Sequence, residues 1–174
     1  MKSGALLTLP NTVSLSRLVL AAAFIVADGA WQRVLLIAAA GATDFLDGWI
    51  ARRQRIESRT GALIDPVADR AFVLTAMSVY LFESLISTTE YFVILARDFA
   101  TALGFLVAKA VPKLRPAVFE ARLLGKTVTV LQLSFLVIVL LLPVLSDALV
   151  LAIGVLSAAS IVDYTIALWR ARAR

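Results

Sequence analysis

Long apolar stretches separated by short polar breaks run through the whole chain. Each stretch approaches the ~20 residues that an α-helix needs to cross the hydrocarbon core of a bilayer. The breaks are too short for a separate soluble domain, so we expect a single all-α integral membrane domain over residues 1–174 with six transmembrane helices. The predicted helices cover Pro10–Ala27, Trp31–Arg52, Gly61–Leu85, Thr89–Ala110, Leu123–Leu145 and Asp147–Trp169.

Basic residues gather in alternate links between the predicted helices, whereas the other links are mainly acidic. By the positive-inside rule, the two basic links and both termini lie on the cytoplasmic side, and we expect a bacterial-type inner (cytoplasmic) membrane. This orientation accounts for the net charge of +5, so no nucleic-acid partner is expected. The two groups are Arg52, Arg53, Arg55 and Arg59, then Lys109, Lys113, Arg115, Arg122 and Lys126.

Four aspartates interrupt the second and third predicted helices near their cytoplasmic ends: Asp44, Asp47, Asp65 and Asp69. Charged groups inside membrane helices are costly and mark functional sites. Asp44 and Asp47 are three residues apart, and Asp65 and Asp69 are four apart, so each pair falls on one face of its helix. Two such pairs facing each other would form an oxygen-rich box for one or two divalent cations.

Composition narrows the chemistry of this box. The chain is 61% hydrophobic with a mean hydropathy of +0.92, and it contains no histidine and no cysteine. Imidazole and thiolate ligands are therefore excluded. A metal ion here must be held by oxygen, which favours magnesium, manganese or calcium over zinc.

Small and basic residues surround the aspartates. Gly48 and Ala51 lack bulk and let an extended ligand approach the helix closely. Arg52 is suited to phosphate oxygens, and Gly61 opens the next helix beside the same site. Metal ions bridging a diphosphate would polarise the phosphorus–oxygen bond to be broken. The residues alone thus predict a metal-dependent enzyme acting on a phosphorylated, lipid-linked substrate.

The pattern Asp-x2-Asp-Gly-x2-Ala-Arg-x8-Gly-x3-Asp-x3-Asp spans Asp44 to Asp69 and resembles the signature of the CDP-alcohol phosphatidyltransferases at every position. The resemblance implies transfer from CDP-diacylglycerol to an alcohol with release of CMP, in a homodimer. It implies that the four aspartates bind two Mg²⁺ or Mn²⁺ ions and that Asp69 is also the general base. The CDP-binding positions would be Gly48, Ala51, Arg52 and Gly61.

A second basic set, Arg97, Arg115, Arg122 and Lys126, suits an anionic acceptor. The segments around Arg97 and Lys126 resemble phosphatidylglycerophosphate synthases, which use glycerol 3-phosphate, and also cardiolipin synthases, which use phosphatidylglycerol. Gly104-Phe105 stands where the former commonly carry a second arginine. We favour glycerol 3-phosphate, with phosphatidylglycerol, inositol phosphate and serine as alternatives. A purely structural pairing of Arg97 with an aspartate is the competing interpretation.

A small cation transporter is the alternative from a different class, with the four carboxylates as an ion path. Neighbouring arginines would repel cations from such a path, and transport does not require the glycine and alanine spacing. The enzyme is therefore the favoured prediction.

Overall fold

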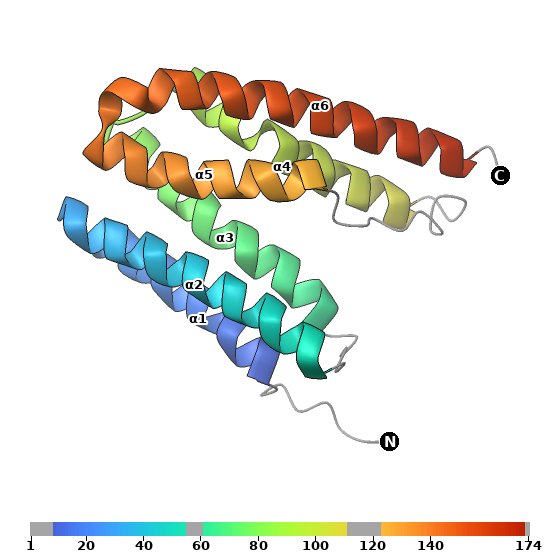
Figure 1. The fold of residues 1–174 in the computed structure, drawn as a ribbon, viewed down its shortest axis with the longest axis horizontal. Helices are drawn as coiled ribbons and strands as arrows, with labels where there is room; N and C mark the ends of the chain where they lie inside the picture. The colour runs from blue at the N-terminus through green and yellow to red at the C-terminus, as the bar shows by residue number, and fades with distance from the viewer. Residues whose placement is uncertain (1–8, 55–60, 111–122, 173–174) are drawn as a thin grey trace. The chain divides into compact units, whose positions relative to one another are not determined.

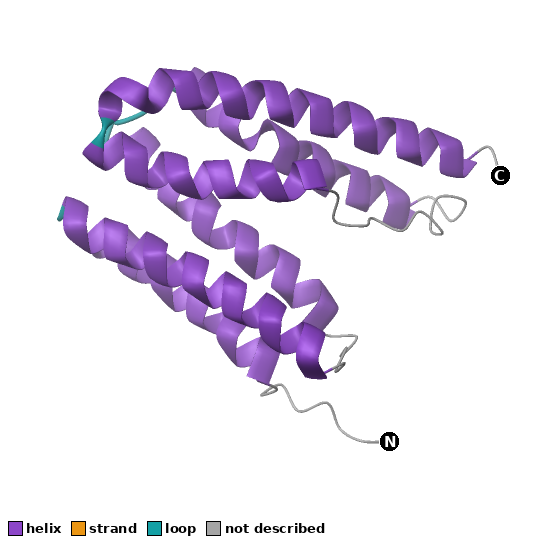
Figure 2. Cartoon of the chain, viewed as in Figure 1, coloured by secondary structure: helices purple, strands orange, loops and turns teal. Residues whose placement is uncertain are grey.

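The computed structural model describes residues 9–54, 61–110 and 123–172, and the side chains of residues 16–43, 70–104, 124–166 and 169. The described residues form six α-helices and no strand, which confirms the predicted all-α class (Figures 1 and 2). The helices are α1 Leu9–Val26, α2 Ala30–Gln54, α3 Gly61–Phe82, α4 Thr88–Ala110, α5 Leu123–Leu141 and α6 Ser146–Arg172.

Two of the described segments are long and apolar enough to cross a membrane: Leu124–Leu141 in α5 and Pro143–Ile166, which includes most of α6. Two shorter apolar helical segments are Ser16–Val26 in α1 and Arg70–Phe82 in α3. The prediction of six membrane crossings remains a prediction.

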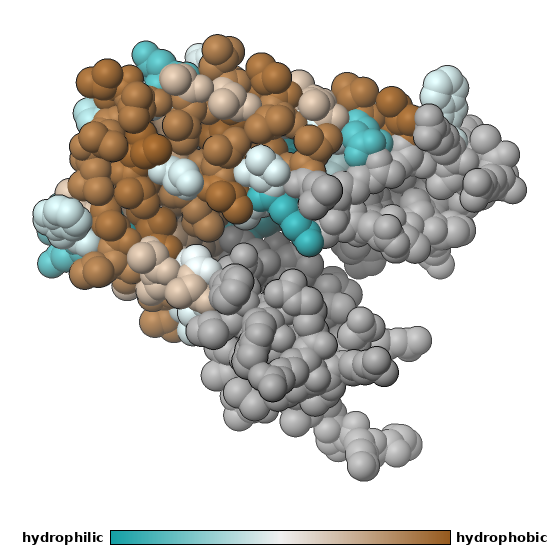
Figure 3. All heavy atoms as spheres, in the orientation of Figure 1, coloured by the Kyte–Doolittle hydropathy of each residue, from teal (hydrophilic) through white to brown (hydrophobic). Residues whose placement is uncertain are grey.

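Apolar side chains are exposed on the surface of both the early and the late helices. On α6, Leu151, Val155, Val162 and Ile166 are exposed at spacings of four and seven residues, which places them on one face of the helix. On the face of the molecule drawn in Figure 3, hydrophobic residues cover most of the described surface. An apolar outer face of this kind suits contact with lipid rather than water.

The third and fifth helices end earlier than predicted, each for a local reason. The fifth helix was predicted to reach Leu145, but α5 ends at Leu141 because Pro143 begins a 3-10 turn, Pro143–Leu145. The residue before a proline is driven out of the α conformation, which stops the helix. The third helix was predicted to reach Leu85, but α3 ends at Phe82, and Ser84 takes a positive φ of 59°.

Residue contacts divide the chain into two compact units, residues 1–83 and residues 84–174. In the first unit, α1 packs against both α2 and α3. Phe24 of α1 meets Phe72 of α3 edge to face, with ring centroids 5.7 Å apart. Buried positions repeat every three or four residues: Arg17, Ala21 and Phe24 on α1; Arg33, Ile37 and Ala40 on α2; Phe72, Val73, Ala76, Met77 and Tyr80 on α3.

A buried arginine ties α2 directly to α3 in this unit. Arg33 is 4% exposed, and its two terminal nitrogens donate to the two carboxylate oxygens of Glu83. Its Nε donates to the Ala27 carbonyl oxygen at 2.8 Å. The guanidinium also lies over the rings of Phe24 and Tyr80, at 5.5 and 5.9 Å from their centroids. A bidentate ion pair with this much support fixes one end of α2 against one end of α3.

In the second unit, α6 packs against both α4 and α5. The α4 helix begins with a capping box, in which the Glu90 amide donates to Ser87 Oγ at 3.3 Å and the Ser87 amide donates to Glu90 Oε2 at 2.6 Å. The buried core includes Ile94 and Leu95 of α4, Val128, Phe135, Leu136 and Val139 of α5, and Ile153 of α6. The expected single domain over residues 1–174 remains a prediction.

We expect the Arg33–Glu83 pair to contribute to the free energy of unfolding. Glu83→Gln leaves the buried guanidinium without its counter-charge, so we expect a loss of about 1–2 kcal/mol, which is about 2–8 °C in the unfolding midpoint for a chain of this size. The hydrogen bonds from Arg33 lower the pKa of Glu83 below its ordinary value. Stabilisation by a carboxylate with a lowered pKa is complete above its unfolded-state pKa and is lost as pH falls through the folded-state value.

Thermal unfolding of the purified proteins in detergent, followed from pH 7 down to about pH 4, tests this prediction. The midpoint difference between wild type and Glu83→Gln is expected to shrink as the pH falls. The double variant Arg33→Met/Glu83→Gln removes both charges and is expected to be more stable than Glu83→Gln alone. Equal midpoints for wild type and Glu83→Gln at pH 7 would contradict the proposed role of the pair.

Candidate active site

The four aspartates lie on α2 and α3. Asp44 and Asp47 fall within α2, Ala30–Gln54, and Asp65 and Asp69 fall within α3, Gly61–Phe82. Both stretches are helical, as the spacing argument requires. The side chains of these aspartates lie outside the described part of the structure, so their convergence on metal ions remains a prediction.

The Arg33–Glu83 pair identifies the sides of α2 and α3 that face each other. Helix periodicity puts positions 44 and 47 within about 40° of Arg33 around the α2 axis. The same periodicity puts positions 65 and 69 within about 40° of Glu83 around the α3 axis. The Glu83 amide bonds the Val79 carbonyl oxygen at 2.9 Å, so the helical count extends to that residue. All four positions therefore fall on the sides of the helices that the ion pair joins.

The positions of Asp47 and Asp69 along the helix axes also agree with a site shared by α2 and α3. Asp47 is 14 residues after Arg33, and Asp69 is 14 residues before Glu83. At a rise of 1.5 Å per residue, both positions are about 21 Å from the ion pair. Because α2 runs away from the pair and α3 runs towards it, straight antiparallel helices would bring the two positions level. This geometry suits an all-oxygen metal site shared by the two helices.

The predicted nucleotide-binding positions belong to the same two helices. Gly48 and Ala51 follow Asp44 and Asp47 by four residues each along α2, so they share that side of the helix. Arg52 is next to Ala51, and Gly61 is the first residue of α3. The roles of these four residues remain predictions, because their surroundings are outside the described side chains.

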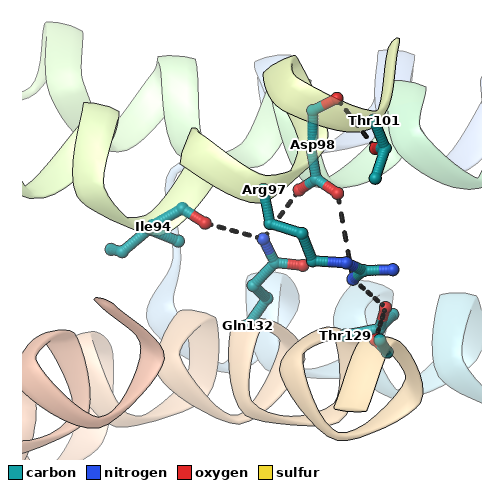
Figure 4. Close-up of polar contacts among 7 residues, drawn as sticks. Ile94, Arg97, Asp98, Thr101, Thr129 and Gln132 are labelled. Carbon is teal, nitrogen blue, oxygen red and sulfur yellow. Dashed lines mark hydrogen bonds and ion pairs between the residues drawn. The ribbon is translucent and has the colours of Figure 1, made fainter. Parts of the chain in front are cut away.

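A polar cluster lies between α4 and α5 in the second unit (Figure 4). Arg97 is 7% exposed, and its Nη1 donates to Thr129 Oγ1 at 3.1 Å. The Thr129 hydroxyl in turn donates to the Gly125 carbonyl oxygen at 3.1 Å. Asp98 Oδ1 is 4.0 Å from Arg97 Nη1, at the outer limit of an ion pair. The guanidinium therefore has a hydrogen-bond partner on α5.

Gln132 completes this cluster and was missed by the sequence analysis. Its side-chain nitrogen donates to Asp98 Oδ2 at 2.7 Å and to the Ile94 carbonyl oxygen at 2.8 Å. Gln132 is 2% exposed, so both bonds are shielded from solvent. The sequence carried a signal for it, since Gly125, Thr129 and Gln132 follow one another at spacings of four and three residues and so share one side of α5.

The structural alternative for Arg97 is supported only in part. An aspartate does stand beside the guanidinium, but Gln132 holds the nearer bond to that carboxylate. Lys126, next to Gly125 on α5, is exposed. Arg115 and Arg122, the other two predicted acceptor-binding residues, lie outside the described residues.

Comparison with known proteins identifies the family of this chain. A model of the CDP-alcohol phosphatidyltransferase family matches residues 7–165, which include helices of both units. One relative is the CDP-diacylglycerol–glycerol-3-phosphate 3-phosphatidyltransferase of Aquifex aeolicus. It is 30% identical over 175 residues, covering 92% of this chain and 95% of the relative.

Two further relatives match over shorter stretches. The CDP-diacylglycerol–glycerol-3-phosphate 3-phosphatidyltransferase of Rickettsia bellii is 35% identical over 107 residues, 62% of this chain and 57% of the relative. The CMP-forming cardiolipin synthase of Streptomyces coelicolor is 33% identical over 103 residues, 53% of this chain and 47% of the relative. The extent of the family match settles the class: the chain is an enzyme of the CDP-alcohol phosphatidyltransferase family.

Proposed function

We propose that this protein transfers the phosphatidyl group of CDP-diacylglycerol to glycerol 3-phosphate, with release of CMP, in a reaction that depends on Mg²⁺ or Mn²⁺. The observation that carries the proposal is the ion pair between Arg33 and Glu83. The sides of α2 and α3 joined by this pair are the sides on which the four aspartate positions fall. Four carboxylates and no imidazole or thiolate form a donor set that fits two such ions.

Each residue has a defined task in this proposal. Asp44, Asp47, Asp65 and Asp69 hold the metal ions, which supply charge neutralisation to the diphosphate when bound. Asp69 also accepts the proton of the attacking hydroxyl. The acceptor oxygen forms a bond to the phosphorus of the phosphatidyl group as the bond from that phosphorus to the CMP oxygen breaks. The cytidine diphosphate lies against Gly48, Ala51, Arg52 and Gly61.

The proposed acceptor follows from charge and from the relatives. Arg97, Arg115, Arg122 and Lys126 would bind the phosphate of glycerol 3-phosphate. The Aquifex aeolicus relative, which matches over nearly its whole length, is named for that acceptor. The second candidate is phosphatidylglycerol, because a relative over about half the chain is named a cardiolipin synthase.

We further propose that the enzyme is a homodimer in a bacterial-type inner membrane, with both termini and the active site on the cytoplasmic side. Basic links after α2 and between α4 and α5 support this orientation. A site at this boundary keeps the acyl chains of the donor in lipid while its nucleotide meets a water-soluble acceptor.

The proposed reaction is tested by CMP release from CDP-diacylglycerol in detergent with Mg²⁺ or Mn²⁺. Glycerol 3-phosphate, phosphatidylglycerol, inositol 1-phosphate and serine are supplied in separate reactions. We expect glycerol 3-phosphate to give the highest kcat/KM and a chelator to abolish release, because the carboxylates alone cannot neutralise the diphosphate. Release with phosphatidylglycerol only would establish the second candidate. Cation flux in liposomes without CMP release from any acceptor would contradict the proposed reaction.

The role of Asp69 is tested by Asp69→Asn, which keeps the shape of the side chain and removes its charge and basicity. We expect CMP release to fall on the order of a thousandfold or more while CDP-diacylglycerol still binds. Asp147→Asn is the control, since Asp147 is exposed in the first turn of α6. An Asp69→Asn enzyme with wild-type turnover would exclude this residue as the base.

The role of Lys126 is tested by Lys126→Ala and Lys126→Arg. Loss of the cation in the alanine variant is expected to raise the KM for glycerol 3-phosphate by about tenfold, with little change for CDP-diacylglycerol. The arginine variant keeps the charge and is expected to recover most of the loss. Equal changes in both KM values for the alanine variant would argue against acceptor binding.

A further inference from the structure

Gly125 occupies a position where α4, α5 and α6 come together. A Cβ atom built on this residue would lie 2.8 Å from Arg97 Nη2, 3.4 Å from Arg97 Cζ and 3.5 Å from the Tyr164 hydroxyl. Real Cβ atoms essentially never stand as close as 2.8 Å to another heavy atom. The guanidinium therefore rests where a side chain of α5 would otherwise be.

The rest of the cluster fixes the guanidinium in that place. Thr129, one turn after Gly125, accepts from Nη1 and donates to the Gly125 carbonyl oxygen, both at 3.1 Å. One turn further, Gln132 holds the Asp98 carboxylate at 2.7 Å. The other carboxylate oxygen of Asp98, Oδ1, lies 4.0 Å from Arg97 Nη1. The Thr129 hydroxyl positions Nη1, and Nη2 occupies the space that a side chain at position 125 would take.

Gly125 lies next to a second cation, so the place that it leaves for the Arg97 guanidinium matters for the binding of an anion. Lys126 is the next residue on α5 and is exposed. Consecutive Cα atoms are about 3.8 Å apart, so the Arg97 guanidinium is seated beside the helical turn that also carries a second cation. Two cations held by one turn suit a phosphate monoester, whose charge exceeds one at neutral pH.

We propose that Gly125 is a positioning residue for acceptor binding. Its missing side chain seats the Arg97 guanidinium against the turn of α5 that carries Lys126, and so sets the spacing of the two cations that receive the acceptor phosphate. This inference rests on the proposed function, in which Arg97 and Lys126 bind that phosphate. In this role, Gly125 favours acceptors that carry a phosphate monoester.

The test is a double-mutant cycle with Gly125→Ala, Arg97→Lys and the combined variant. Lysine has no Nη2 atom to meet a methyl group at position 125. Gly125→Ala alone is expected to raise the KM for glycerol 3-phosphate by about ten- to hundredfold, because a displacement of about 1 Å has effects of this size. The KM for CDP-diacylglycerol is expected to stay within about twofold of wild type. In the Arg97→Lys background, Gly125→Ala is expected to add less than about twofold to the acceptor KM.

Gly154 of α6 supplies the matched control. A Cβ atom there would lie 3.0 Å from Val93 Cγ1, so Gly154→Ala crowds α4 in the same unit without touching a polar group. We expect it to leave both KM values near those of wild type. Thermal unfolding adds a readout that does not need catalysis, since any loss of stability caused by Gly125→Ala should be smaller in the Arg97→Lys background.

The outcomes separate the two proposals. Equal effects of Gly125→Ala on both substrates, or the same effect with arginine and with lysine at position 97, would overturn the positioning role while leaving the reaction intact. Wild-type enzyme that releases no CMP with any acceptor would overturn the proposed function and this inference together.

Discussion

A charged side chain inside an apolar helical unit must be paired within that unit, and both halves of this chain meet that requirement with a buried arginine. In the first unit Arg33 of α2 bonds Glu83 after α3, while α1 packs against both helices. In the second unit Arg97 of α4 bonds Thr129 of α5 and lies 4.0 Å from the Asp98 carboxylate, while α6 packs against both helices. In each unit the third helix packs along the other two, and the arginine adds polar contacts between those two. Apolar packing allows one helix to shift slightly along another. A guanidinium that is hydrogen-bonded between two helices does not allow such a shift.

This requirement connects stability with the candidate chemistry. Metal ions require oxygen ligands within a few tenths of an ångström, and a slip of one helical turn moves a ligand by about 5.4 Å. The Arg33–Glu83 pair sets the register of α2 against α3 about 21 Å away from the level of Asp47 and Asp69. In the sequence, Arg33 and Glu83 look like surface charges that set membrane orientation. Their ion pair restricts the positions that α2 and α3 can take.

The sequence predicted the helices and the family well because both depend on local patterns. Six apolar stretches correspond to the six helices of the described residues, and the fixed spacings between Asp44 and Asp69 indicated the family that the match over residues 7–165 confirms. The pairing of Arg33 with Glu83 was not predicted. These residues are 50 positions apart, and each lies near the end of a predicted helix, where charges usually report orientation. Gln132 was missed for a related reason, since one amide in an apolar helix gains meaning only from the carboxylate facing it.

Relatives that share the CDP-alcohol chemistry carry names for two different acceptors, so acceptor choice cannot follow from the residues that the shared reaction requires. The aspartate signature belongs to that shared chemistry and lies in the first unit. The second unit holds a buried cation whose position depends on an α5 glycine, a threonine and a glutamine. Small changes at these neutral positions would move a charge by a fraction of an ångström or more without altering net charge. We therefore expect substitutions at these positions to change acceptor selection while the aspartate signature stays the same.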